Sequence, residues 1–203
     1  MTAFDAQGAR QFWNWFREFS PNLRANNDDP AVISEVDSRV GKLEPALTWE
    51  IGSGNSKPWQ FVISPDLDPN LRDKARAIIA LAPELSDWEF YSARQPKNWN
   101  YRFTLTKESP TETISVDATG WQFALLQYPN GEHEVLIEAK GLPQLSDSER
   151  WCAAAVVLES ILGEEVVLEH INSFDLTADL GPELVCKAKP IRDLRDTFAS
   201  VLP

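Results

Sequence analysis

Strand, turn and helix patterns occur in the same order twice along this chain of 203 residues. Residues 46–93 carry the pattern of a hairpin, a helix and a strand, and residues 121–171 repeat it about 75 positions later. This order predicts an α+β fold with a mainly antiparallel sheet and helices packed on one side. The sheet is built either from two ββαβ-like halves or from one domain with this order by chance. We expect a single domain over residues 1–203.

The N-terminal segment, residues 4–43, is expected to be helical. Phe12 and Phe16 recur at helical spacing on an apolar stripe. Ser20-Pro21 is expected to end the first helix, because proline is tolerated only in a first turn. Asp29-Pro30 supplies the N-cap and first residue of a second helix.

Alternating apolar and polar residues predict the strands. The first hairpin joins residues 47–51 to 59–63, and the second joins residues 121–128 to 133–139, each through a turn rich in Gly, Asn or Pro. Further strands are expected at residues 88–91, 114–118, 166–171 and 184–187. Residues 94–109 are expected to form either a long connection or a loop around a short strand at 101–105.

Two helices are marked by residues that favour helix ends. Asp68-Pro69 resembles an N-cap followed by the first helical residue. Ser146 and Glu149 have the spacing of a capping box, in which each side chain binds a free backbone N–H of the other. The helix that they begin is expected to bury Trp151 and to end at Gly163.

Acidic residues are concentrated in the second half of the chain. Between Lys107 and Lys187 there are fifteen carboxylates and two cations, whereas residues 1–105 carry fourteen acids and twelve bases, and the net charge is -12. This balance disfavours nucleic acid and anionic membranes as partners and permits a basic protein partner. No apolar run approaches the length of a membrane span, and no signal peptide is visible.

The two cysteines, Cys152 and Cys186, lie among apolar residues. They are expected to act as small buried hydrophobes in a reducing compartment. Together with the absence of a visible signal peptide, this usage predicts a cytoplasmic protein.

Sequence motifs of known chemistry are not found. The chain has no P-loop, no G-x-S-x-G elbow and no metal-ligand spacing around its two histidines, His133 and His170. Gly52 to Asn55 is interpreted as a hairpin turn rather than an anion-binding nest. We therefore predict no catalytic residue, no cofactor and no metal ligand, and the sequence favours a non-enzymatic protein while leaving an enzyme open as the alternative.

Several phrases resemble those of an uncharacterised family of bacterial proteins. The resemblance spans most of the chain in the same order and implies an α+β bacterial protein, with no activity to carry over. It rests on Phe12-Trp13-Asn14-Trp15-Phe16, Trp49-Glu50-Ile51-Gly52, Phe61-Val62-Ile63-Ser64, Ala82-Pro83-Glu84-Leu85, Trp88-Glu89-Phe90 and Ile161-Leu162-Gly163-Glu164.

The leading functional hypothesis is a non-enzymatic interaction protein that binds a basic partner, such as an immunity protein that neutralises a bacterial toxin. Exposed aromatic residues and the acidic second half would form its surface. The residues predicted to contact the partner are Trp59, Trp99, Glu132, Glu134, Glu138, Glu164 and Glu165. A homodimer is a further hypothesis.

The alternative hypothesis is a small-molecule-binding protein or an enzyme. Glu50 lies between Trp49 and Ile51 on an apolar strand, so a buried Glu50 would need a cationic partner. The polar groups expected in such a pocket are Glu50, Arg94, Arg102 and His170.

Overall fold

A computed structural model describes residues 4–106, 112–140, 142 and 145–202 of the chain. Contacts between Cα atoms divide the chain into two compact units, residues 1–94 and 95–203, and each is described here by itself. The single domain over residues 1–203 stays a prediction.

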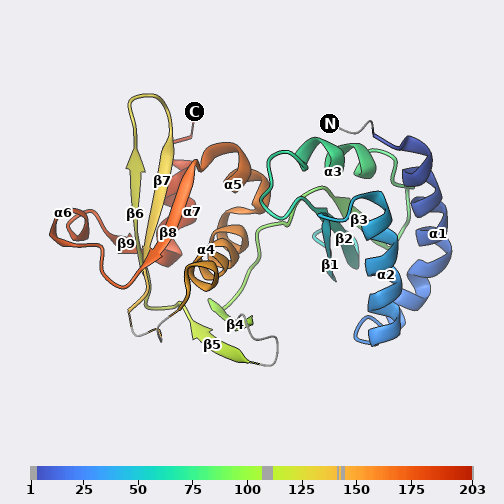
Figure 1. The fold of residues 1–203 in the computed structure, drawn as a ribbon, viewed down its shortest axis with the longest axis horizontal. Coiled ribbons are helices and arrows are strands. Elements are labelled where there is room, and N and C mark those ends of the chain that lie inside the picture. The colour runs from blue at the N-terminus through green and yellow to red at the C-terminus, as the bar shows by residue number, and fades with distance from the viewer. Residues whose placement is uncertain (1–3, 107–111, 141, 143–144, 203) are drawn as a thin grey trace. The chain divides into compact units, whose positions relative to one another are not determined.

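The first unit combines three helices with a three-stranded sheet (Figure 1). The sheet order is β1-β2-β3, in which β1 and β2 are antiparallel while β2 and β3 are parallel. The elements are α1 (Ala6–Ala25), α2 (Pro30–Leu43), β1 (Thr48–Ser53), β2 (Trp59–Ser64), α3 (Arg72–Ile79) and β3 (Trp88–Tyr91).

Helix α1 continues past Pro21, where the sequence predicts its end. Proline has no N–H to donate to the carbonyl of Arg17, one turn earlier. The hydroxyl of Ser20 donates to that carbonyl instead, at 3.4 Å. Pro21 is exposed, and the helix ends only at Ala25. The predicted N-cap at Asp29 is confirmed, since its side chain accepts the N–H of Ala31 at 2.8 Å.

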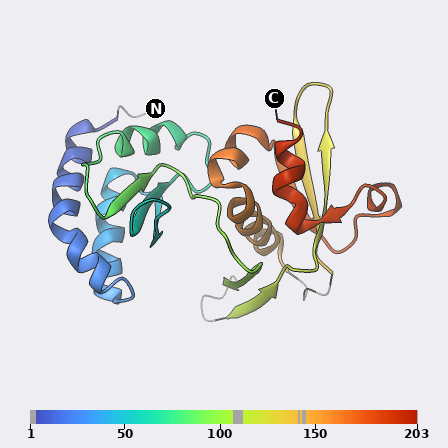
Figure 2. The ribbon, with the colours of Figure 1, turned by 180° about the vertical axis from the view of Figure 1, so that it is seen from behind.

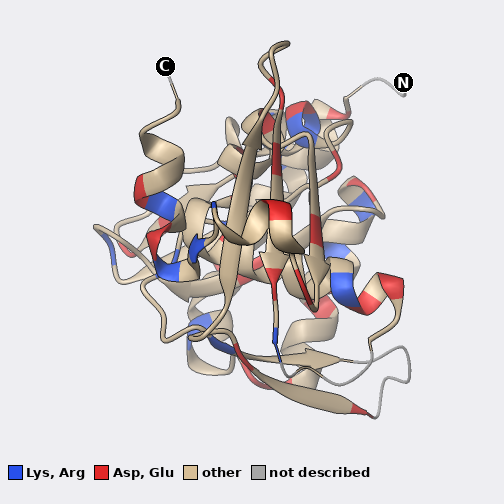
Figure 3. Cartoon of the chain, turned by 90° about the vertical axis from the view of Figure 1, so that its left-hand side faces the viewer, with Lys and Arg blue, Asp and Glu red and all other residues tan. Residues whose placement is uncertain are grey.

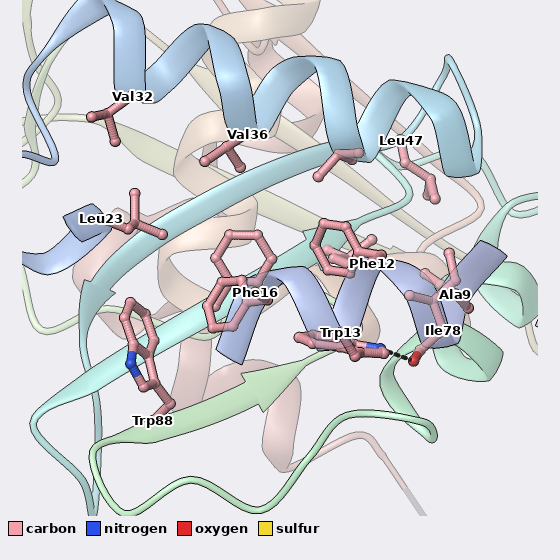
Figure 4. Packing of buried hydrophobic residues seen from close by; sticks show 14 residues of the cluster. Ala9, Phe12, Trp13, Phe16, Leu23, Val32, Val36, Leu47, Ile78 and Trp88 are labelled. Carbon is pink, nitrogen blue, oxygen red and sulfur yellow. Dashed lines mark hydrogen bonds between the residues drawn. The ribbon is translucent and has the colours of Figure 1, made fainter. Parts of the chain in front are cut away.

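One face of the first sheet packs against the helices. The register pairs Trp49 with Ile63 and Ile51 with Phe61, so these side chains share a face. Phe61 and Ile63 are fully buried in a cluster with residues of α1, α2 and α3. Figure 4 shows this packing, including the 2.7 Å hydrogen bond from the Trp13 indole N–H to the carbonyl of Ile78.

The second unit has a two-stranded sheet, β4-β5, and a four-stranded sheet of order β8-β7-β6-β9. In the larger sheet β6 and β7 are antiparallel, whereas β7 and β8 are parallel. The elements are β4 (Arg102–Thr106), β5 (Thr113–Asp117), β6 (Gln122–Gln127), β7 (His133–Glu138), α4 (Asp147–Leu162), α5 (Glu164–His170), β8 (Ser173–Thr177), α6 (Pro182–Val185), β9 (Lys189–Pro190), a 3-10 turn (Ile191–Asp193) and α7 (Leu194–Ala199).

Within the second unit, α4, α5 and α7 lie on one side of the strands and α6 lies on the other (Figures 1 and 2). Helix α4 begins with the predicted capping box, in which Glu149 N–H donates to Ser146 Oγ and Ser146 N–H donates to Glu149. It ends at Gly163, whose φ of 87° favours glycine. Gly163 also precedes α5, so it separates two consecutive helices.

The structure confirms the α+β fold with antiparallel-rich sheets and two ββαβ-like halves. Each half is an antiparallel strand pair followed by a helical crossover to a parallel third strand. The described strands form three sheets rather than one. The third strand of the second half is β8, so that half extends beyond residue 171 to Thr177.

Three predicted elements are wrong. Residues 166–171 form most of α5 rather than a strand, and residues 184–187 form the end of α6 and the turn after it. Short apolar runs such as these do not separate strand from helix by periodicity. Asp68 caps a turn instead of a helix: it accepts the N–H of Asn70 at 2.9 Å, and α3 begins four residues later.

The predicted burial of three residues in the second unit is also wrong. Trp151 is 45% exposed, and its ring lies 5.6 Å from that of Phe174. Cys152 and Cys186 are exposed free thiols. Trp151 and Cys152 lie in the second turn of α4, and the buried apolar residues of this helix begin at Ala153.

Candidate functional site

The four residues predicted to line one pocket lie in different units. In the first unit, Glu50 is half-buried on β1, and Arg94 donates to Thr48 Oγ1 and to Asp66, each at 2.8 Å. In the second unit, Arg102 pairs with Asp117 at 2.9 Å. His170 lies in the last turn of α5, and its carbonyl oxygen is 3.2 Å from His133 Nδ1.

The acidic residues predicted to contact a partner differ in accessibility. Glu132 is exposed, whereas Glu134 and Glu165 are half-buried. Glu138 is 2% exposed and pairs with Lys140 at 2.9 Å, and Glu164 is fully buried. Glu138 and Glu164 therefore do not belong to an accessible acidic surface, which corrects their assignment.

The two tryptophans predicted as partner anchors are both half-buried. Trp59 begins β2, and its ring centroid lies 6.1 Å from that of Trp88 in the core cluster. Trp99 lies before β4, with Tyr101 and Phe103 at 5.3 and 6.1 Å between ring centroids. Trp59 thus packs at the edge of the hydrophobic core of the first unit, whereas Trp99 packs against Tyr101 and Phe103 in the second unit.

The loop after β1 forms a nest of backbone N–H groups, whereas the sequence predicts only a hairpin turn there. The nest is filled by the chain's own carboxylate: Glu89 on β3 accepts the N–H groups of Asn55 at 2.8 Å, of Ser56, and of Lys57 at 2.7 Å. Tyr91 donates to the same carboxylate at 2.8 Å. The Ser56 hydroxyl, followed by the Asn55 N–H, holds the pKa of Glu89 well below its ordinary value.

A pocket in the second unit gathers cationic and aromatic side chains. It has a volume of about 200 Å³ and lies between the segment before β4, the end of α4, and the start of α7. Its lining residues are Lys97, Asn98, Trp99, Tyr101, Ile161, Arg192, Arg195 and Asp196. We call this site the basic pocket.

The walls of the basic pocket are held by the free carbonyl groups at the end of α4. The last carbonyls of a helix have no partner within it. Lys97 N–H donates to the carbonyl of Ser160, and Arg195 Nε donates to that of Ile161, each at 2.8 Å. These two contacts fix residues far apart in the sequence around one helix end.

Arg195 keeps donors available for a ligand. Its hydrogen bond to Ile161 uses Nε alone, and a guanidinium carries five N–H donors. Arg192 forms an ion pair of 3.8 Å with Asp193, too long for a hydrogen bond, and its side chain is 71% exposed. Both arginines therefore present N–H groups that a carboxylate or phosphate oxygen would accept.

Two aromatic residues that line the basic pocket, Trp99 and Tyr101, each have an unusual feature. Tyr101 has φ of 60°, a left-handed conformation that costs a bulky residue about 1–3 kcal/mol. The indole N–H of Trp99 is buried and has no acceptor in the described part of the chain. An unsatisfied buried donor costs about 1–3 kcal/mol, which a water molecule or a polar ligand atom would offset. Backbone strain and unpaired polar groups often mark functional sites.

The charge of the basic pocket is opposite to that of the chain. Three cations and one carboxylate line it, whereas the chain carries a net charge of -12. Figure 3 shows the blue basic positions on and just before α7, next to the C-terminus. The sequence does not predict that Lys97 meets Arg192 and Arg195, because about 95 residues separate the two segments.

Neither a metal site nor a membrane-spanning helix is found among the described residues. Among them, no group of three or more His, Cys, Asp and Glu residues could hold a metal ion. No helix in the described ranges is both long enough and apolar enough to span a membrane.

Comparison with family models, with curated proteins and with solved structures found no match for this chain. The resemblance to an uncharacterised bacterial family stays a prediction.

Proposed function

We propose that the second unit binds a small anionic ligand at the basic pocket. The observation that supports this proposal most strongly is the convergence of Lys97, Arg192 and Arg195 on one hollow of an acidic chain. Asp196 is the one carboxylate among the described residues of the lining, so positive charge is in excess there, which favours an anion. The lining residues are mainly hydrogen-bond donors, which suit binding and orientation of an anion.

Calorimetric titration of the full chain with inorganic phosphate tests this function. Arg192→Gln is the variant of choice because its side chain is largely exposed and makes no short contact. Loss of one charge-assisted hydrogen bond costs about 1.5–3 kcal/mol, so the Kd should rise roughly 10- to 100-fold. Arg150→Gln, which alters an arginine paired with Asp147 at the start of α4, should leave the Kd unchanged.

Two results would refute this function. One is the absence of binding for phosphate, sulfate and acetate. The other is equal binding by wild type, Arg192→Gln and Arg150→Gln, which would place the anion elsewhere. Raising the salt concentration should weaken binding in wild type, because the interaction is electrostatic.

The exposed carboxylates of the second unit support a second function, the binding of a basic protein. Five of these exposed residues are Glu132, Glu169, Asp175, Asp179 and Glu183. Their negative field would speed association with a basic partner, as in an immunity protein that neutralises a toxin. A bacterial cytoplasmic location and pairing of two copies stay predictions, and light scattering at two concentrations tests the latter.

A pull-down from lysate of the source organism tests this second function. A basic partner should be retained at low salt and released at moderate salt. The double variant Glu169→Lys/Asp175→Lys should lose the partner, and Glu18→Lys in the first unit should retain it. Retention that is insensitive to salt and to both variants would contradict it.

A further inference from the structure

The basic pocket has an aromatic wall as well as a cationic one. Trp99 and Tyr101 both line the pocket, and their rings lie 5.3 Å apart at 38°. Phe103 supports Trp99 from a centroid distance of 6.1 Å, outside the lining residues. A simple inorganic anion needs only the cations, so the aromatic wall indicates a ligand with an apolar part.

The backbone around the wall is fixed. The carbonyl of Tyr101 accepts the N–H of Ala118 at 2.8 Å, and the N–H of Arg102 donates to Asn100 Oδ1 at 3.2 Å. These contacts hold Tyr101 in its left-handed conformation. A strained backbone persists only where the surroundings determine it, and such strain is typical of ligand-binding positions.

The pocket volume limits the size of the ligand. The pocket measures about 200 Å³, whereas pockets that bind drug-sized ligands measure about 300–1,000 Å³. An apolar cavity of about 150 Å³ holds one benzene molecule. The basic pocket therefore has room to enclose one ring and one small charged group, but not a whole nucleoside triphosphate.

We infer that the ligand of the basic pocket is a single-ring aromatic acid, with its ring against Trp99 and Tyr101 and its carboxylate or phosphate at Arg192 and Arg195. This inference rests on the proposed anion-binding function and narrows its ligand class. Both walls are needed: the cations bind the acid group, and the rings contact the ring of the ligand by stacking or edge contacts.

Calorimetric titration of the full chain with four probes tests the ligand class: phenyl phosphate, benzoate, inorganic phosphate and neutral benzyl alcohol. Phenyl phosphate should bind about tenfold more tightly than inorganic phosphate, the factor expected of one aromatic contact. Benzoate should bind, whereas benzyl alcohol should not.

Trp99→Leu separates the two walls. It should remove the preference for phenyl phosphate over inorganic phosphate while leaving the Kd of inorganic phosphate within about twofold, since the cations remain. Trp59→Leu, which alters a half-buried tryptophan of the first unit, should keep the preference. The wild-type indole N–H spectrum gives a readout that does not depend on folding of Trp99→Leu. Its Trp99 signal, assigned by its loss in Trp99→Phe, should shift further with phenyl phosphate than with inorganic phosphate.

The outcomes distinguish this inference from the function on which it rests. If inorganic phosphate binds and phenyl phosphate binds no more tightly, the aromatic ligand class is wrong and the anion-binding function stands. The same conclusion follows if Trp99→Leu keeps the wild-type preference. If none of the charged probes binds, both proposals are wrong.

Discussion

The Ser56 hydroxyl donates a hydrogen bond to the carboxylate of Glu89 at 2.5 Å, which ties the loop after β1 to the strand β3. The same carboxylate satisfies three consecutive backbone N–H groups of that loop. A buried carboxylate is stable only when it is paired in this way. One side chain therefore sets the conformation of a whole hairpin loop in the first unit.

Replacing Glu89 by Gln should destabilise the first unit. The amide NH2 would face N–H donors where a carboxylate oxygen accepts hydrogen bonds. We expect the thermal midpoint, measured by circular dichroism, to fall by several degrees. Glu84→Gln, at an exposed position of the same unit, is the control and should leave the midpoint unchanged. Equal midpoints for the two variants would contradict the role assigned to Glu89.

Acid should destabilise the chain through two carboxylates. Hydrogen bonds from Ser56 and Asn55 lower the pKa of Glu89 below its ordinary 4.5. Those from Thr119, with a smaller effect of Arg102, lower the pKa of Asp117 from 3.8 to about 2. A carboxyl group whose pKa is lowered by folding stabilises the protein fully above its unfolded pKa, and this stabilisation is lost as the pH falls.

The urea midpoint should therefore decrease as the pH falls from about 4.5 to about 2. In Glu89→Gln this decrease should be shallower, because one of the carboxyl groups whose pKa folding lowers is gone. A midpoint that is constant over this range, or an equal slope in the variant, would show that the loop does not favour the ionised form of Glu89.

Gly54→Ala should disturb the same loop from the backbone side. A methyl group at Gly54 would overlap the carbonyl oxygen of Lys57 and lie 3.0 Å from that of Trp59. Because these atoms are backbone, the loop would have to shift away from Glu89. The unfolding free energy should fall, and the effects of Gly54→Ala and Glu89→Gln should not add.

Gly41→Ala is the matched control for this prediction. Gly41 lies within α2, and an added methyl group would meet nothing within 4 Å. Alanine favours the helix by about 1 kcal/mol over glycine, so this variant should be slightly more stable. A loss of stability in both glycine variants would contradict the assigned difference between the two sites.

Replacing Phe198 should lower both the stability of the second unit and the affinity of the basic pocket for phosphate. It is 1% exposed on α7, the helix that carries Arg195, and its ring lies 5.6 Å from that of His133. Phe198→Ala should cost about 3–5 kcal/mol of unfolding free energy and should weaken phosphate binding. Phe16→Ala in the first unit should cost a similar amount without changing phosphate affinity. Urea unfolding and calorimetry together measure both effects.

Local sequence patterns predicted most of the hairpins and capped helices. The alternation around Trp49 and the capping box at Ser146 each depend on neighbouring residues, so they can be recognised without the fold. The segment 164–170 was misread because Val166 and Val167 favour strands, while its helical state depends on Gly163 and on tertiary contacts.

The basic pocket could not be predicted in the same way. The sequence predicts Trp99 as a partner contact, but it does not indicate Arg192 or Arg195 as site residues. Their position depends on α7 packing at the end of α4, where Arg195 meets the carbonyl of Ile161. The pocket of Glu50, Arg94, Arg102 and His170 stays a prediction, because the first two residues belong to the first unit and the other two to the second.

The location of anion binding is the most direct test of the central claim. Titration of the full 15N-labelled chain with inorganic phosphate, followed by amide chemical shifts, gives this location residue by residue. The account predicts saturable shifts concentrated at residues 97–101, 160–161 and 191–196, which surround the basic pocket. No shifts, or shifts centred on the Glu89 loop at residues 54–58, would contradict it.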